Sequence, residues 1–154
     1  MIELFKKYRW YIISAFCLFL IYLFSRLVNL TSLPIFTDEA IYLRWAQTAK
    51  NDANWRFISL TDGKQPFFVW LAMIAMKFIS DPLIAGRIVS VGSGILGMIF
   101  SGLIGYELFK EKKIGLLAAA LYVAYPSVLL YDRFALMESL LGAMVLMSIY
   151  LEIL

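Results

Sequence analysis

Long apolar runs dominate this chain and constrain its fold more than any other feature. Of its 154 residues, 62% are hydrophobic, whereas a soluble domain is usually about 45–50% apolar. The runs cover about residues 10–30, 66–79, 84–109, 114–130 and 134–154. Because a helix needs about 20 apolar residues to cross a bilayer, the runs predict an all-α integral membrane protein, a polytopic helical bundle.

The run at 66–79 is too short for a span and predicts a helix that lies in the membrane interface. Two basic clusters test this prediction, since basic loops face the cytoplasm. They contain Lys6, Lys7 and Arg9, and Lys110, Lys112 and Lys113. Both clusters fall on the cytoplasmic side only if 66–79 does not cross. We therefore predict a multi-pass protein of the cell membrane with a cytoplasmic N-terminus and four spans; a five-span topology is the alternative.

This topology places the loop 31–65 and the start of the last span on the outer face. The charged residues expected there are Asp38, Glu39, Lys64, Arg87, Asp132, Arg133 and Glu138. They share one compartment, so the topology predicts one outer-face site.

The chain reads as a single transmembrane module over residues 1–154. Ser93, Gly97, Ser101 and Gly105 recur every four residues, a small-residue stripe on which another helix can pack closely. The last apolar run reaches Leu154 with no closing loop. We therefore expect an N-terminal part of a longer protein, with further helices to close a cavity.

Several classes of site are excluded by composition. The chain has no histidine and one cysteine, Cys17, which excludes a disulfide framework, a cysteine-rich zinc site and a Ser-His-Asp triad. Any metal would therefore need carboxylate ligands. The net charge of +3 is modest and predicts loops biased for membrane orientation, with no nucleic-acid partner.

A short amphipathic helix is predicted to begin near residue 37. Thr37 can cap it, and acidic residues suit a first helical turn. Ile41, Trp45 and Ala49 share one face. Asp38 and Glu39 either complement the helix dipole or carry function.

Three further charged positions flank the apolar runs. Lys64 precedes Gln65 and Pro66 at the interface, where an ammonium either snorkels or binds a lipid phosphate. Glu138 lies about one turn into an apolar run, where a charge is costly, and is expected to face the bundle interior. Asp132 and Arg133 are adjacent and either neutralise each other or take part in a site.

These pieces, in this order, resemble the N-terminal module of the GT-C glycosyltransferases. The likeness is greatest to family 39, which contains protein O-mannosyltransferases, lipid A aminoarabinose transferases and related bacterial enzymes. The matching stretches are SRLVNLTSLPIFTDEAIY, DGKQPFFVWLAMIAMKF, DPLIAGRIVSVGSGILG and YDRFALMESLLGAMVLMSIYL. The resemblance implies a GT-C-type bundle with an outer-face juxtamembrane loop and short interfacial helices.

The resemblance also implies a function and roles. Such enzymes move a sugar from a polyprenyl-phosphate donor to a glycan, lipid or protein acceptor at the outer membrane face, with inversion. Asp38 matches the essential acidic residue of the family and is expected to be the base. Lys64 matches the residue that meets the carrier phosphate. Glu138 matches a second acidic position, usually Asp and often followed by Pro; here Ser139 follows it.

The remaining roles follow from residue chemistry. Glu39 is a further candidate for the catalytic group, orienting the acceptor. Arg133 and Arg87 are candidates, with Lys64, for binding the donor phosphate. A divalent cation is the cofactor that the chemistry allows, with Asp38 and Glu138 as its ligands.

Two other functions fit the composition. A transporter or flippase subunit would use the acidic residues as an ion or substrate path, although such residues usually lie near the bilayer midplane. A non-catalytic assembly protein would use only the small-residue stripe.

Overall fold

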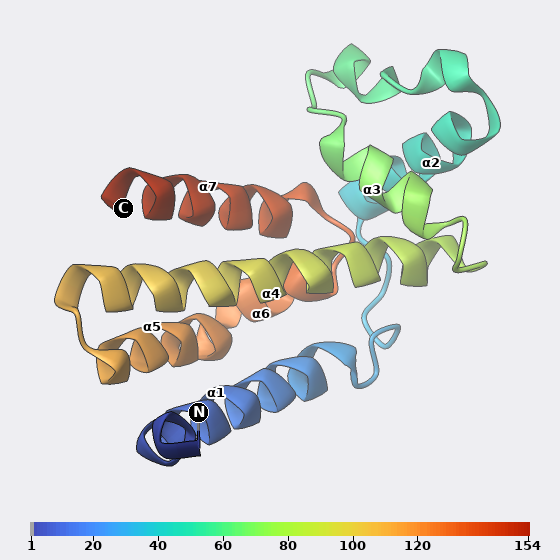
Figure 1. The fold of residues 1–154 in the computed structure, drawn as a ribbon. Helices are drawn as coiled ribbons and strands as arrows, with labels where there is room; N and C mark the ends of the chain where they lie inside the picture. The colour runs from blue at the N-terminus through green and yellow to red at the C-terminus, as the bar shows by residue number, and fades with distance from the viewer. Residues whose placement is uncertain (1) are drawn as a thin grey trace.

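The computed structural model describes residues 2–154 of the chain, with side chains from residue 9 onward, and the described part is helical (Figure 1). The elements are α1 (Ile2–Leu27), α2 (Thr37–Asn51), η1 (Ala53–Trp55), η2 (Ile58–Asp62), α3 (Phe67–Ala75), α4 (Pro82–Phe109), α5 (Lys112–Ala124), α6 (Pro126–Arg133) and α7 (Met137–Ile153). Here η marks a short 3₁₀ turn.

Two helical segments are long and apolar enough to cross a membrane. They are Arg9–Leu27, with 19 residues, and Pro82–Phe109, with 28 residues. The pair α5–α6 gives a third candidate span if its two bent helices are counted as one. Helix α7, with 17 residues, and α3, with 9 residues, are shorter than these candidates. The structure is therefore compatible with a membrane protein of two or three such segments.

The span predicted at 114–130 corresponds to two helices, α5 and α6, and not to one continuous helix. Helix α5 ends at Ala124 and α6 begins at Pro126, and the two helices meet at an angle of 63°. Proline has no N–H for the helix and disfavours helical geometry in the residue before it. Tyr125 accordingly takes the extended conformation, with φ −69° and ψ 119°.

Helix α4 is the central element, with α5 and α7 packed along it (Figure 1). Helix α5 lies on the predicted small-residue stripe. A Cβ atom at Gly105 would lie 2.8 Å from the Cβ atom of Ala118, and the hydroxyl of Ser101 donates to the Ala118 carbonyl at 3.2 Å. The stripe thus serves helix packing, as expected from its spacing.

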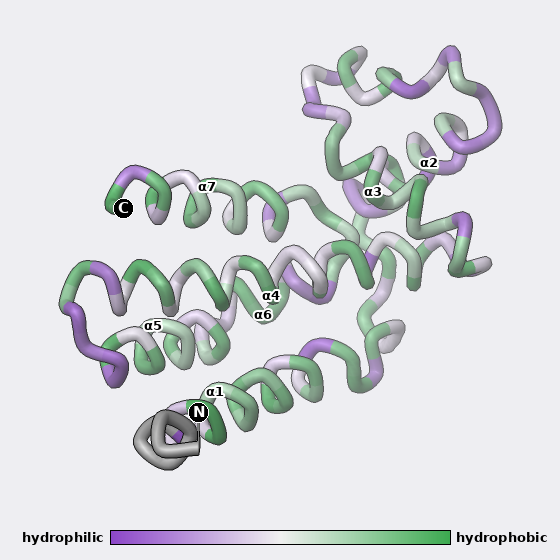
Figure 2. Tube along the Cα trace, in the orientation of Figure 1, coloured by the Kyte–Doolittle hydropathy of each residue, from purple (hydrophilic) through white to green (hydrophobic). Residues whose placement is uncertain are grey.

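The bundle has two different ends. The start of α1, the turn between α4 and α5 and the C-terminus lie toward one end, while α2, α3 and the 3₁₀ turns lie at the other (Figure 1). Hydrophilic residues gather at the α2–α3 end and at the α4–α5 turn, whereas the long helices between them are mainly hydrophobic (Figure 2).

Helices α2 and α3 pack on each other and on the start of α4 through a small apolar core. That core includes Tyr42, Ala46, Phe68, Val69 and Ala85. The expected apolar face of α2 is therefore shifted, since Ile41 is 39% exposed while Tyr42 and Ala46 are buried. Helix α4 begins at Pro82, two residues before the predicted run of 84–109. Pro82 occupies its first turn, and the Asp81 carboxylate accepts hydrogen bonds from two backbone N–H groups.

Candidate functional site

A buried ion pair joins α2 to α4 at the polar end of the bundle. Both side chains are fully buried, and Arg87 donates from Nε to Glu39 Oε1 at 2.7 Å and from Nη2 to Oε2 at 2.8 Å. Such a two-point pair fixes the orientation of both planar groups. The guanidinium also lies 5.5 Å from the ring centre of Phe134.

The same pair also hydrogen-bonds to backbone groups of the surrounding segments. Arg87 Nη1 donates to the Leu30 carbonyl at 2.6 Å, and Glu39 Oε1 accepts from the Ala135 N–H at 2.7 Å. Glu39 Oε2 accepts from the Phe36 N–H at 3.3 Å, so Phe36, and not the expected Thr37, precedes the first turn of α2. Glu39 and Arg87 therefore hold the loop after α1, the start of α2, α4 and the α6–α7 connection together.

A second buried polar cluster lies between α1, α4, α6 and α7. Asp132 is buried; its Oδ1 accepts from the Ser139 hydroxyl at 2.8 Å, and its Oδ2 lies 3.3 Å from the Tyr22 hydroxyl. Arg26 Nε approaches Oδ2 at 3.4 Å, and the Tyr22 hydroxyl donates to the Val91 carbonyl at 2.8 Å. We call Tyr22, Arg26, Asp132 and Ser139 the interhelix cluster.

Asp132 and Arg133 do not pair with each other. Arg133 instead donates to the carbonyls of Ser25, at 2.7 Å, and Asn29, at 2.8 Å, at the end of α1. A cation suits the C-terminal end of a helix, where carbonyl groups lack helical partners. Arg133 and Asp132 thus tie α6 to α1 by separate contacts.

The charges of three carboxylates act on Tyr42, a buried residue of α2. The pKa of Tyr42 is raised above its ordinary value, first by burial and then by the negative charges of Glu138, Asp38 and Asp62. Charges shift a pKa only at short range, so the start of α2, the end of η2 and the start of α7 bring these groups together. We call Asp38, Asp62 and Glu138 the acidic end.

The acidic end is open, in contrast to the two buried clusters. Asp38, Asp62 and Glu138 are all exposed. The expectation that Glu138 faces the bundle interior is wrong. Helix α7 begins at Met137, so Glu138 lies in its first turn, where a carboxylate is favoured by the helix dipole.

Lys64 lies two residues after Asp62 and just before α3. Its side chain is half-buried, and its backbone N–H donates to the Ser59 carbonyl at 3.0 Å. Gly63, which ends η2, has φ +68°, a left-handed geometry that glycine adopts readily. This turn carries Lys64 to the same end of the molecule as the acidic end.

The predicted site residues therefore divide into two groups. Asp38 and Glu138 belong to the acidic end, since the charges of both act on Tyr42. Lys64 lies two residues after Asp62, the third residue of the acidic end. Glu39, Arg87 and Arg133 are engaged in the contacts described above. Of the interhelix cluster, only Asp132 is among the charged residues expected at the outer-face site. One signal for its partners exists, because Tyr22 and Arg26 are four residues apart in an apolar helix, where an arginine needs a partner. Arg26 Nη2 has no hydrogen-bond partner within the described residues.

Metal binding by the chain alone has a limited ligand set. Among the side chains that the structure describes, from residue 9 onward, no three His, Cys, Asp or Glu residues are grouped so that they could hold a metal ion. A divalent cation at Asp38 and Glu138 would therefore need its further ligands from a substrate.

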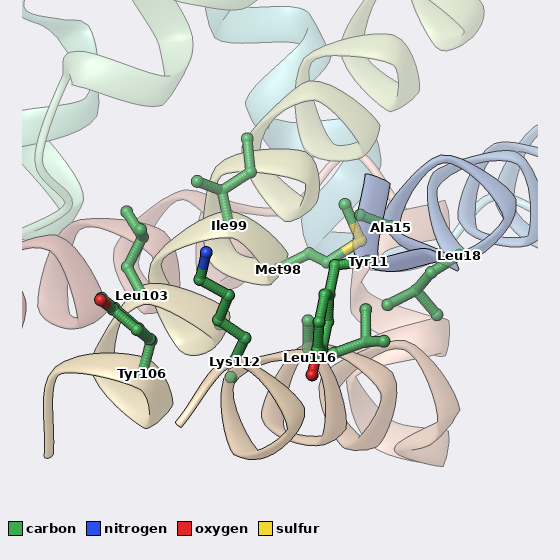
Figure 3. A pocket seen from close by; sticks show the side chains of 12 residues that line it. Tyr11, Ala15, Leu18, Met98, Ile99, Leu103, Tyr106, Lys112 and Leu116 are labelled. Carbon is green, nitrogen blue, oxygen red and sulfur yellow. The ribbon is translucent and has the colours of Figure 1, made fainter. Parts of the chain in front are cut away.

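An apolar hollow of about 330 Å³ lies toward the opposite end of the bundle, between α1, α4 and α5 (Figure 3). Tyr11, Met98 and Leu116 line it, and Lys112 extends along it (Figure 3). None of the predicted site residues lines this hollow.

The fold and the site define an all-α protein with two or three segments suited to crossing a membrane and with exposed carboxylates gathered at one end. Comparison with protein-family models, curated proteins and solved structures found no match for this chain.

Proposed function

We propose that this protein is a membrane glycosyltransferase that moves a sugar from a polyprenyl-phosphate donor to an acceptor hydroxyl. The observation that carries the proposal is that Asp38 and Glu138 are exposed in the first turns of α2 and α7, near enough to Tyr42 for both charges to raise its pKa. The order of the sequence motifs, which resembles GT-C family 39, supplies the reaction class. The apolar helices on which this end rests offer a lipid carrier a surface beside the site.

The reaction needs a base, an open position for the acceptor and a cation for the leaving group. Asp38 would accept the proton of the acceptor hydroxyl while its oxygen forms a bond to the anomeric carbon. The bond from that carbon to the phosphate oxygen breaks, and the polyprenyl phosphate leaves with the electron pair. Attack from the face opposite the phosphate inverts the anomeric centre.

Exposure decides which residues receive roles. Asp38 is exposed, whereas both oxygens of the neighbouring Glu39 are buried and bonded to Arg87. The guanidinium groups of Arg87 and Arg133 are likewise held by protein groups. The proposal therefore gives the donor phosphate to Lys64, which would stabilise the charge that develops on it. Glu138 would orient the acceptor or share a divalent cation with Asp38.

Sugar transfer by Asp38→Asn tests the proposal. Membranes that contain the protein from its complete gene would be incubated with a panel of polyprenyl-phosphate hexoses and pentoses carrying a radiolabelled sugar. We expect label to move from the carrier to an acceptor, and Asp38→Asn to lower this rate by about 10²–10⁴-fold, the usual contribution of a general base.

Glu111→Gln is the matched control, since it removes an exposed carboxylate near the α4–α5 turn, at the other end of the bundle. It should transfer sugar at the wild-type rate. Transfer by Asp38→Asn at the wild-type rate would remove Asp38 as the base. Movement of intact donor across the membrane without transfer would favour a flippase.

A further inference from the structure

A polar hollow separate from the acidic end lies between the second half of α2 and the α3–α4 connection. Its volume is about 370 Å³. Helix α2 contributes Arg44, Gln47, Lys50 and Asn51, and the opposite wall includes Ser80. The lining thus holds two cations and three neutral hydrogen-bonding groups, but no carboxylate.

The acidic residues nearest in sequence are turned to other partners. Asp81 Oδ1 accepts from the N–H groups of Leu83, at 2.8 Å, and Ile84, at 3.2 Å, at the start of α4. Asp52 Oδ1 accepts from the Asn54 N–H at 2.9 Å. The positive charge of the hollow is therefore not balanced by a carboxylate in its lining.

The two cations have different degrees of constraint. Lys50 Nζ donates to the Met76 carbonyl at 2.7 Å, which ties α2 to the end of α3 and leaves two ammonium donors for another partner. Arg44 is exposed, and no hydrogen bond or ion pair of its guanidinium occurs among the described residues. The contact with Met76 gives Lys50 a structural role, whereas no contact of this kind explains Arg44.

We propose that this hollow binds a phosphate group, carried by an anionic membrane lipid. Arg44 and Lys50 supply charge-assisted donors, and Gln47, Asn51 and Ser80 supply neutral ones. Phe78 lies in the sequence between the lining residues Met76 and Ser80, and its side chain is 84% exposed. An aromatic ring beside a cationic hollow suits an interface in which the ring enters the apolar layer and the cations meet the headgroup.

This site is distinct from the one assigned to sugar transfer. Arg44 lies about 9 Å along α2 from Asp38, and Lys50 about 18 Å, at the helical rise of about 1.5 Å per residue. None of Asp38, Lys64 or Glu138 lines the hollow. Phosphate binding in this hollow therefore does not depend on sugar transfer at Asp38.

The test measures binding of phosphatidylglycerol to the protein in detergent by native mass spectrometry, with phosphatidylcholine as the neutral lipid. We expect Arg44→Gln to weaken phosphatidylglycerol binding about tenfold, the effect of losing one charge-assisted contact. Arg44→Gln/Lys50→Gln should weaken it further. Arg56→Gln, which removes an equally exposed guanidinium outside the hollow, should bind as the wild type does.

A second arm titrates inorganic phosphate by calorimetry and separates the two sources of a phosphate group. Phosphate binding that depends on Arg44, without a preference for phosphatidylglycerol, would keep the phosphate site and assign it to a soluble ligand. Equal phosphatidylglycerol binding by Arg44→Gln and Arg56→Gln, with no binding of inorganic phosphate, would overturn the proposal. Arg44→Gln is the decisive variant, since its side chain holds no part of the fold.

Discussion

The interior of the bundle and its α2–α3 end both carry carboxylates, but they hold them in opposite ways. Glu39 and Asp132 are buried and bonded to residues from other helices. Asp38 and Glu138 are exposed, and the charges of both raise the pKa of Tyr42. Neighbours such as Asp38 and Glu39 thus differ in what they are free to do: a buried, fully bonded carboxylate stabilises the fold, whereas an exposed one is available to a ligand.

The largest expected effect is on stability, from breaking the buried pair. Glu39→Gln leaves the Arg87 charge without its partner and should lower the free energy of unfolding by about 3–5 kcal/mol, the usual cost of an unpaired buried charge. Unfolding by sodium dodecyl sulfate, followed by circular dichroism, measures it.

The matched variant is Asp38→Asn, which should change the free energy of unfolding by less than about 0.5 kcal/mol, as surface substitutions usually do. Equal destabilisation by the two variants would erase the distinction between the buried and the exposed carboxylate. Glu39→Leu/Arg87→Met, which removes both charges, should be more stable than Glu39→Gln.

A smaller loss of stability is expected where α2 and the α6–α7 connection meet α4. A Cβ atom at Gly86 would contact Leu43 Cδ2 and lie 2.7 Å from the Cβ atom of Ala135. Gly86→Ala should therefore cost about 1–3 kcal/mol, the usual penalty for overpacking. The same unfolding measurement applies.

Gly92→Ala is the control on the same helix, since a Cβ atom there meets nothing within 4 Å. It should be neutral or slightly stabilising, because alanine favours a helix more than glycine does. If Gly86→Ala and Gly92→Ala were equally stable, the close approach of Leu43 and Ala135 to α4 at Gly86 would be disproved.

Local sequence rules predict much of the fold and less of the site. Run lengths predict the helices, and the small-residue spacing predicts the face of α4 on which α5 packs. The break at Pro126 follows from proline chemistry, but the continuous hydrophobicity of 114–130 hides it. The order of the apolar runs also predicts that Asp38, Lys64 and Glu138 lie on the same side of the membrane.

The partners of individual charges could not be predicted in the same way. Glu39 and Arg87 are 48 residues apart, and no local pattern links them. Arg133 bonds to carbonyls of the α1 end and not to its neighbour Asp132, because helix packing brings those carbonyls close. The exposure of Glu138 depends on where α7 begins, which hydropathy does not define within a turn.

The smallest expected effect concerns Tyr42, which links the buried core to the acidic end. Its pKa in the folded protein is raised above 10.0, so the unfolded chain loses this proton first. The stability that its neutral hydroxyl contributes is complete below pH 10 and is lost as the pH rises toward the folded-state pKa. Tyr42→Phe should therefore lose less stability than the wild type as the pH rises above about 10.

The free energies of unfolding of the wild type and of Tyr42→Phe are measured at the same pH values and subtracted, so that the contributions of other titrating groups cancel. Glu138→Gln removes one charge that raises the Tyr42 pKa and should move the loss to lower pH. Parallel pH profiles for wild type and Tyr42→Phe would show that the pKa of Tyr42 is not raised, and an unchanged loss in Glu138→Gln would show that the charge of Glu138 does not act on this hydroxyl.

Labelling with a membrane-impermeant thiol reagent tests the central claim most directly. In a Cys17→Ser background, Asp38→Cys, Lys64→Cys and Glu138→Cys would be labelled in intact cells and in inverted vesicles, with Lys110→Cys at the other end as the reference. The account predicts that positions 38, 64 and 138 label from one side and position 110 from the other. Labelling of positions 38 and 138 from opposite sides would contradict it.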